Sequence, residues 1–294
     1  MHFGVILPNY GAGSGRLAVL DTALAAESAG YQSVWTTDHL ALPRGDAERF
    51  SPILEALMTL GFLAGSTARV KLGVSALVLP QRNPLEVARE VATLDVLSGG
   101  RVILAAGIGW SQGEYANLGY SFTDRARRME EALQVLRTCW RGNRIVSYQG
   151  RYYRFEQVDF APPPIQAGGP PLWVAGNSPS ALNRALRLAD GWHPVGLPPD
   201  VLADQLAKVR PLLANRPFSV AVRLSVAWER EAAEGGALCG SPEQILEILR
   251  LYQSSGATAF LLHFLADTQS ERERALRAFA REIIPHFPRD VEMG

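Results

Sequence analysis

The stretch "VKLGVSALVLPQRNPLEVAREVATLDVLSGGRVILAAGI", residues 70–108, holds two short apolar runs on either side of a longer amphipathic segment. In that segment, residues 84–100, apolar side chains recur at helical spacing and the pattern stops at two glycines. The flanking runs, rich in β-branched residues, are typical of strands. A strand, a helix and a second strand in this order predict a parallel pair joined by a right-handed crossover.

The same alternation continues on both sides of this stretch. Eight strand-helix units in 294 residues predict closure into a (β/α)8 TIM barrel of the α/β class, with residues 1–294 forming a single domain. The other predicted strands and helices are residues 3–8 with 16–30, 33–38 with 52–67, 101–108 with 124–140, 172–176 with 179–189, 191–196 with 199–214, 218–226 with 242–256, and 258–264 with 270–287.

A doubly wound open sheet is the alternative architecture. The first strand-helix turn contains "GAGSG", residues 11–15, which superficially suggests a dinucleotide-binding loop. It lacks the G-x-G-x-x-G spacing, and no acidic residue closes a following strand in the expected frame. The barrel is therefore preferred.

An irregular insertion at about residues 142–171 separates the fourth unit from the fifth. Within it, "IVSYQGRYYRFEQVDFAPPP" places Gln149 and Gly150 between two alternating aromatic runs. This pattern predicts a β-hairpin, which we expect to lie over one end of the barrel.

Composition excludes several classes of partner. The formal net charge is zero, with 29 basic and 29 acidic residues spread along the chain, so no basic face is expected for nucleic acid. Cys139 and Cys239 lie far apart without zinc-ligand spacing, which predicts reduced thiols and no metal site. The apolar runs are too short for a signal peptide or a membrane span. We expect a soluble, cytoplasmic protein.

Polar residues follow several predicted strands at their carboxyl ends, where barrels of this type carry their active sites. Asp38 and His39 end the second strand. After the fifth strand, Gly176, Asn177 and Ser178 precede a helix, so backbone N–H groups, a hydroxyl and the positive helix end converge there. From spacing alone this is either a phosphate site or plain helix capping by Ser178.

At these residues the sequence resembles the bacterial luciferase-like flavin oxidoreductase family, and more closely its branch that uses the deazaflavin coenzyme F420. The similarity runs from about residue 3 to residue 287 and implies a TIM barrel that is commonly dimeric. Its most specific blocks are "VWTTDH" (34–39), "LGVSALVLPQRNPLEVAREVATLDVLSGGRV" (72–102), "GIGW" (107–110), "GEYANLG" (113–119) and "WVAGNSPSALNRALRLADGWHP" (173–194).

The resemblance implies a role for each cofactor-site residue. His39 would be the acid-base catalyst, a role that suits an imidazole near neutral pH, and Asp38 would contact the flavin-like ring. The bond between Ser75 and Ala76 would be a non-proline cis peptide that supports one face of the ring. The remaining cofactor-site residues are Gly107 and Gly109, which would let the fourth strand approach the ring, and Gly176, Asn177 and Ser178, which would hold the phosphate.

Tyr10, Trp110 and Glu114 are the candidate substrate wall, with Glu114 as a second acid. Relatives that act on sugar phosphates grip the phosphate with lysines, but Lys71 and Lys208 do not lie at predicted strand ends. The candidate pocket residues are mostly apolar, aromatic or neutral. We therefore expect a small uncharged organic substrate.

Three functions remain open at this point. The first is hydride transfer between reduced F420 and a small organic substrate. The second is an FMN-dependent two-component monooxygenase of the luciferase or alkanesulfonate type, supplied by a partner flavin reductase. The third is a barrel that binds a flavin without catalysis. In each case we expect a homodimer.

Overall fold

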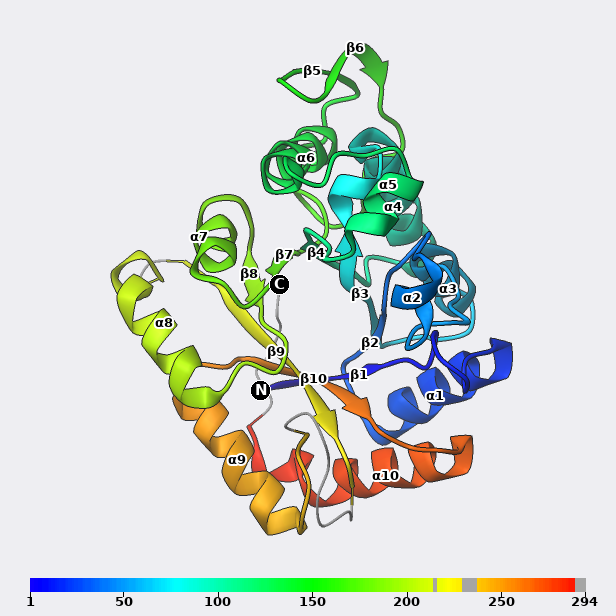
Figure 1. Cartoon of the computed structure of the whole chain (residues 1–294), viewed down its shortest axis with the longest axis vertical. Helices are drawn as coiled ribbons and strands as arrows, with labels where there is room; N and C mark the ends of the chain where they lie inside the picture. Colours follow the sequence, from blue (N-terminus) through cyan, green and yellow to red (C-terminus); the bar gives the residue numbers. More distant parts are fainter. Residues whose placement is uncertain (214–215, 229–236, 289–294) are drawn as a thin grey trace.

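A computed structural model describes residues 1–213, 216–228 and 237–288. Eight parallel strands close into a barrel in the order β1-β10-β9-β8-β7-β4-β3-β2, with β1 paired to both β2 and β10 (Figure 1). The predicted TIM barrel is confirmed and the open sheet is excluded. The barrel strands are β1 (His2–Ile6), β2 (Ser33–Thr36), β3 (Lys71–Val78), β4 (Val102–Gly107), β7 (Leu172–Ala175), β8 (Gly191–His193), β9 (Ser219–Val226) and β10 (Ala259–Phe264).

Helices surround the barrel (Figure 1). Their ends carry local signals: in α4, Asn83 accepts a hydrogen bond from the Leu85 N–H, Pro84 opens the helix, and Gly99 ends it with a φ of 72°. The helices are α1 (Arg16–Ala29), α2 (Arg44–Ala47), α3 (Ala56–Ala64), α4 (Pro84–Ser98), α5 (Gln112–Asn117), α6 (Arg125–Trp140), α7 (Pro179–Leu188), α8 (Pro199–Leu213), α9 (Pro242–Ser254) and α10 (Gln269–Glu282), with 3₁₀ turns η1 (Leu79–Gln81) and η3 (Ile284–His286).

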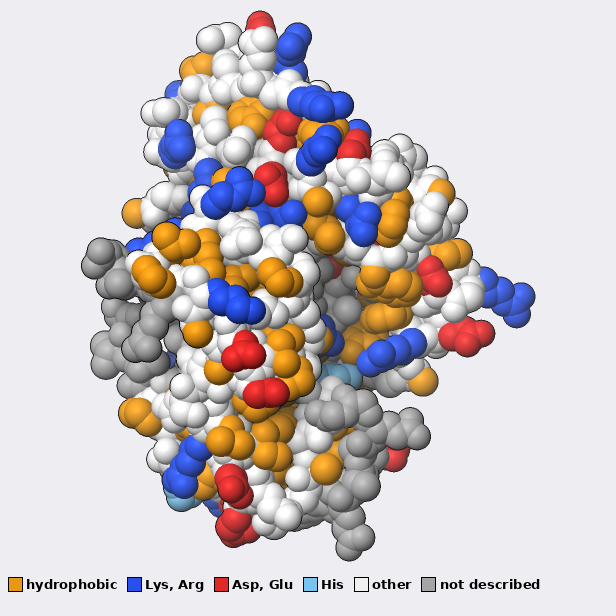
Figure 2. Space-filling view, turned by 60° about the vertical axis from the view of Figure 1, so that its left-hand side comes forward, with side chains coloured by type: hydrophobic (Ala, Val, Ile, Leu, Met, Phe, Trp, Pro, Cys, Tyr) orange, Lys and Arg blue, Asp and Glu red, His pale blue; other side chains and the backbone are white. Residues whose placement is uncertain are grey.

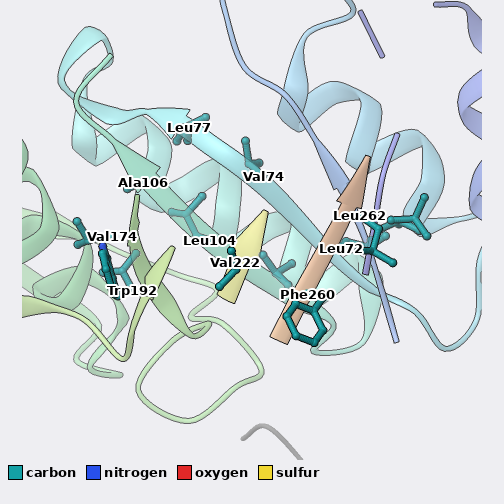
Figure 3. Close-up of a cluster of buried hydrophobic side chains, with 14 of the residues drawn as sticks. Leu72, Val74, Leu77, Leu104, Ala106, Val174, Trp192, Val222, Phe260 and Leu262 are labelled. Carbon is teal, nitrogen blue, oxygen red and sulfur yellow. The ribbon is translucent and has the colours of Figure 1, made fainter. Parts of the chain in front are cut away.

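The larger core lies between the strands and the helices. Alternate strand residues point outward into it, as Leu72 and Val74 of β3 and Val222 of β9 do (Figure 3). Residues between them in the strands point into the barrel lumen.

Two tryptophans fill the middle of the lumen. Trp35 on β2 and Trp173 on β7 stack with ring centroids 5.2 Å apart and are fully buried. Strand glycines make room for them: a Cβ on Gly73 would overlap the Trp35 ring, and one on Gly191 would lie 2.7 Å from Trp173 Cδ1. This pair fills the lumen at its level, and the side chains and backbone beyond it toward the carboxyl ends of the strands line a cavity.

The structure differs from the expected elements in unit two. Residues 52–55 precede the helix expected over 52–67: Ile53 forms an isolated bridge with Tyr10, and the Glu55 side chain caps α3 by accepting from the Met58 N–H. Polar capping at Glu55 therefore sets the helix start later than the apolar pattern indicates.

The insertion forms the predicted hairpin, β5 (Ile145–Gln149) and β6 (Arg154–Asp159), but its expected position over the barrel end is wrong. The hairpin lies outside the ring of strands, beyond α6 (Figure 1). Glu131 of α6 accepts hydrogen bonds from the N–H groups of Tyr152 and Tyr153, and Gln134 of α6 accepts one from Tyr148. These contacts attach the hairpin to the helix.

On the face shown in Figure 2, acidic side chains lie among the basic ones. Within residues 1–213, 216–228 and 237–288, no helix is long and apolar enough to cross a membrane. In the same described ranges, no group of three or more His, Cys, Asp or Glu side chains could hold a metal ion.

Candidate active site

A cavity of about 630 Å³ opens at the carboxyl ends of the barrel strands. Nine of the predicted site residues line it: Tyr10, Asp38, His39, Ser75, Ala76, Gly107, Gly109, Trp110 and Gly176. Glu114, Asn177 and Ser178 do not. The other lining residues are Thr37, Arg49, Phe50, Val78, Ile108, Ala175, Val195, Gly196, Arg223, Leu224, Ser225 and His263.

His39 and Glu114 form a hydrogen-bonded pair at the edge of this cavity. His39 Nδ1 lies 2.9 Å from Glu114 Oε2, while the backbone N–H groups of Leu40 and Ala41 donate to Oε1. Burial raises the pKa of Glu114, but the bond from His39 and those from the backbone outweigh it and lower the pKa overall. An ionised carboxylate places the proton on Nδ1, leaving Nε2 as the ring nitrogen directed away from Glu114.

This arrangement corrects the expected place of Glu114. The side chain is fully buried behind His39 and forms no part of the cavity wall. Ser111 caps the short helix α5, accepting from the Glu114 N–H, and so points Glu114 toward β2. Glu114 orients the imidazole, as carboxylates commonly do beside catalytic histidines.

Asp38 is held by protein groups on both oxygens. Its Oδ1 accepts from Arg82 at 2.7 Å, and its Oδ2 accepts from the Val78 N–H at 2.9 Å. Burial raises the pKa of Asp38, and the neighbouring Arg82 opposes that rise. The carboxylate fastens the end of β3 to β2, and its contact with a cofactor ring stays a prediction.

Small residues make a flat wall on three neighbouring strands. A Cβ on Gly107 of β4 would lie 3.5 Å from the Ala76 Cβ of β3 and 3.8 Å from the Ala175 Cβ of β7. The Ser75–Ala76 peptide is cis, as predicted, and the pairing register of β3 with β4 shifts there. This part of the cavity lining therefore carries no side chain larger than a methyl group.

Gly109 is required by its backbone and its surroundings. Its φ is +67°, and a Cβ would lie 2.6 Å from Val78 Cγ1. Glycine alone adopts this conformation freely.

Aromatic rings surround His39 on its cavity side. Phe50 packs edge-on against the imidazole at 4.5 Å between centroids, and Trp110 does so at 5.6 Å. Trp110 is 53% exposed at the cavity mouth. Phe50 lies outside the motifs that the sequence singled out, because it follows a loop with no periodic pattern.

The guanidinium group of Arg223 lies at the floor of the cavity. Arg223 on β9 donates to the Ser75 carbonyl at 2.8 Å and to the Tyr10 hydroxyl at 3.3 Å. Ser75 Oγ lies 2.8 Å from His193 Nε2, and His193 Nδ1 donates to the Ala221 carbonyl at 2.6 Å. Arg223 and His193 were missed in the sequence because each sits inside an apolar strand run, although both alternate into the lumen.

The predicted phosphate site is an exposed turn. Ser178 caps α7 by accepting from the Ala181 N–H, and the Asn177 side chain exchanges two hydrogen bonds with the Val195 backbone. The side chains of Ser178 and Asn177 thus already have hydrogen-bond partners within the protein, and phosphate binding at this turn stays a prediction. Further along α7, Arg184 is buried and pairs with Glu130 at 3.2 Å.

Comparisons with known proteins identify a family and several relatives. A family model described as luciferase-like monooxygenase matches residues 1–234. A "phthiodiolone/phenolphthiodiolone dimycocerosates ketoreductase" of Mycobacterium tuberculosis is 35% identical over 187 residues, which are 58% of this chain and 49% of that protein. The match thus spans about half the length of this curated relative.

Solved structures share the fold at low identity. Monooxygenase RslO1 from Streptomyces bottropensis superposes with a TM-score of 0.84 at 21% identity, covering 98% of this chain and 100% of that one. An F420-dependent secondary alcohol dehydrogenase, solved with an F420-acetone adduct, gives a TM-score of 0.81 at 18% identity, covering 98% and 99%.

Proposed function

The chain belongs to the luciferase-like monooxygenase family, and from that premise we propose that it transfers a hydride between reduced F420 and a carbonyl group of a small organic substrate. The observation that carries the proposal is the buried His39–Glu114 pair at the edge of a cavity whose wall is flat and small-sided. The ketoreductase relative and the F420-dependent alcohol dehydrogenase fold support the same reaction type.

The residues present fit a flavin-type ring. Ala76, Gly107 and Ala175 would lie against its face, and Gly109 would let β4 approach its edge. Gly176, with Asn177 and Ser178 beyond it, would hold the phosphate. When bound, the cofactor supplies the hydride.

The protein supplies the proton that carbonyl reduction requires. As hydride reaches the carbonyl carbon, the oxygen gains negative charge and needs a proton. His39 gives that proton from Nε2, and the ionised Glu114 fixes the ring orientation and faces the positive charge that the imidazole carries before the transfer. Phe50 and Trp110 limit water access around the imidazole.

An FMN-dependent monooxygenase is the second candidate, favoured by the likeness of the fold to RslO1. Titration with F420 and with FMN, followed by anaerobic assay of ketone reduction, separates the two. We expect tighter binding of F420 and ketone reduction without oxygen. Tighter FMN binding with strictly oxygen-dependent product would replace the proposal with the monooxygenase.

A further inference from the structure

Arg223 carries a positive charge that no carboxylate of the described residues balances. It reaches from β9 to Ser75 on β3, and these two strands are four places apart either way around the barrel. The groups that accept its hydrogen bonds are neutral: the carbonyl and hydroxyl of Ser75 and the hydroxyl of Tyr10. Arg223 is half-buried on the cavity lining, and a partly desolvated charge held only by neutral acceptors is costly unless a ligand in the cavity pairs with it.

The other ionisable groups of the cavity do not compensate for this charge. Asp38 is already paired with Arg82, and Glu114 is bonded to His39 and to the backbone. His193 and His263 are neutral near pH 7, because burial, reinforced by the charge of Arg223, lowers the pKa of His193 to about 4 and that of His263 to about 3. Arg49 adds a second positive charge on the lining.

Donors beside Arg223 suit an anion. Because the Tyr10 oxygen accepts from Arg223, its own proton is available, either to His263 Nε2 at 3.4 Å or to a ligand. Planar guanidinium groups bind carboxylates with two parallel hydrogen bonds. A neutral donor such as an amide side chain could also donate a hydrogen bond to the Ser75 carbonyl. This hydrogen bond therefore does not explain why the residue is charged.

We propose that Arg223, with Tyr10, binds the carboxylate of the substrate, so that the molecule whose carbonyl meets His39 is an oxo acid. The assignment of a carbonyl to the substrate rests on the proposed function. The assignment of a carboxylate rests only on the residues that line the cavity. It replaces the uncharged substrate expected from the sequence, which overlooked Arg223.

The test is a binding comparison that needs no turnover. Calorimetry measures binding of 4-oxopentanoate and 6-oxoheptanoate, and of their primary amides, to the protein saturated with whichever cofactor it prefers. We expect at least one acid to bind about ten-fold or more tightly than its amide, as a charge-assisted pair implies. Equal binding of acid and amide for both lengths overturns the proposal.

Variants test whether the preference for the acid over its amide depends on Arg223. Arg223→Gln keeps a donor for the Ser75 carbonyl and removes the charge, so the ratio of acid to amide affinity should fall to about one, whereas Arg223→Lys should retain part of it. The matched control is Arg141→Gln, an exposed arginine outside the cavity, which should keep the full ratio. A ratio that survives Arg223→Gln contradicts the proposal. If neither variant folds, the comparison in the unmutated protein still decides.

Two further readouts separate the possible failures. Affinity for F420 or FMN should be unchanged in Arg223→Gln, and loss of cofactor with an intact acid preference would assign the guanidinium to the cofactor instead. Acids that bind through Arg223 without being reduced would refute the proposed function and keep the subsite. Oxo acids reduced equally well by the unmutated protein and by Arg223→Gln would refute the carboxylate subsite and keep the proposed function.

Discussion

His39 Nδ1 and Glu114 Oε2 lie 2.9 Å apart, and this contact joins the end of β2 to the short helix α5 across 75 residues of sequence. It fixes which imidazole nitrogen faces the cavity. The first prediction tests this relationship directly.

Glu114→Gln should lower kcat/KM for ketone reduction by about 10- to 100-fold, because the amide keeps a polar contact but loses the charge opposite the imidazolium. Cofactor affinity should change less than about two-fold. Steady-state kinetics and cofactor titration measure both. Glu130→Gln, which removes a carboxylate paired with Arg184 away from the cavity, is the control and should leave the kinetics unchanged.

Ser178→Asp tests the phosphate site. Aspartate also caps helices, so α7 should persist, while its negative charge should weaken binding of F420 or FMN by about ten-fold or more. Thr268→Asp makes the same change at the N-cap of α10 and should leave cofactor affinity intact. If affinity is unaltered in a folded Ser178→Asp protein, the phosphate binds elsewhere, such as after β9 or β10.

Gly109→Ala should lower the free energy of unfolding by more than Gly119→Ala does. Both glycines have positive φ, at +67° and +74°, so both substitutions carry a backbone cost of about 1 kcal/mol. Only at Gly109 does the new Cβ meet Val78, while nothing lies within 4 Å of it at Gly119. Urea denaturation of the two variants measures the difference. Equal losses would mean that Val78 moves aside without cost.

His193 should make stability depend on pH. Burial, with the nearby Arg223, lowers its folded pKa to about 4, against 6.5 in the unfolded chain. Between these values the unfolded chain binds one proton more, so stability falls as pH drops from 6.5 toward 4, by up to about 1.4 kcal/mol per pH unit. Denaturation at several pH values should show a shallower slope for His193→Gln. Above pH 7 the two curves should run parallel, and identical slopes below pH 6.5 would refute the assignment.

The fold was predictable from the sequence because each strand-helix unit carries its own local signal, such as the Asn83 cap and the Gly99 stop of α4. Site residues that end strands, such as Asp38 and His39, were found for the same reason. The role of Glu114 was not, because it depends on a contact between distant segments. Arg223 was missed because the sequence does not show which residues of β9 face the lumen. In the closed barrel Arg223 faces the lumen and donates to the Ser75 carbonyl.

The most direct test of the central claim is His39→Ala, assayed for both F420 binding and ketone reduction. The account predicts that affinity stays within a few-fold while the reduction rate falls by about 10²- to 10⁴-fold, the usual contribution of a positioned acid-base residue. A rate close to that of the unmutated protein would contradict the account, because the proton would then come from another group.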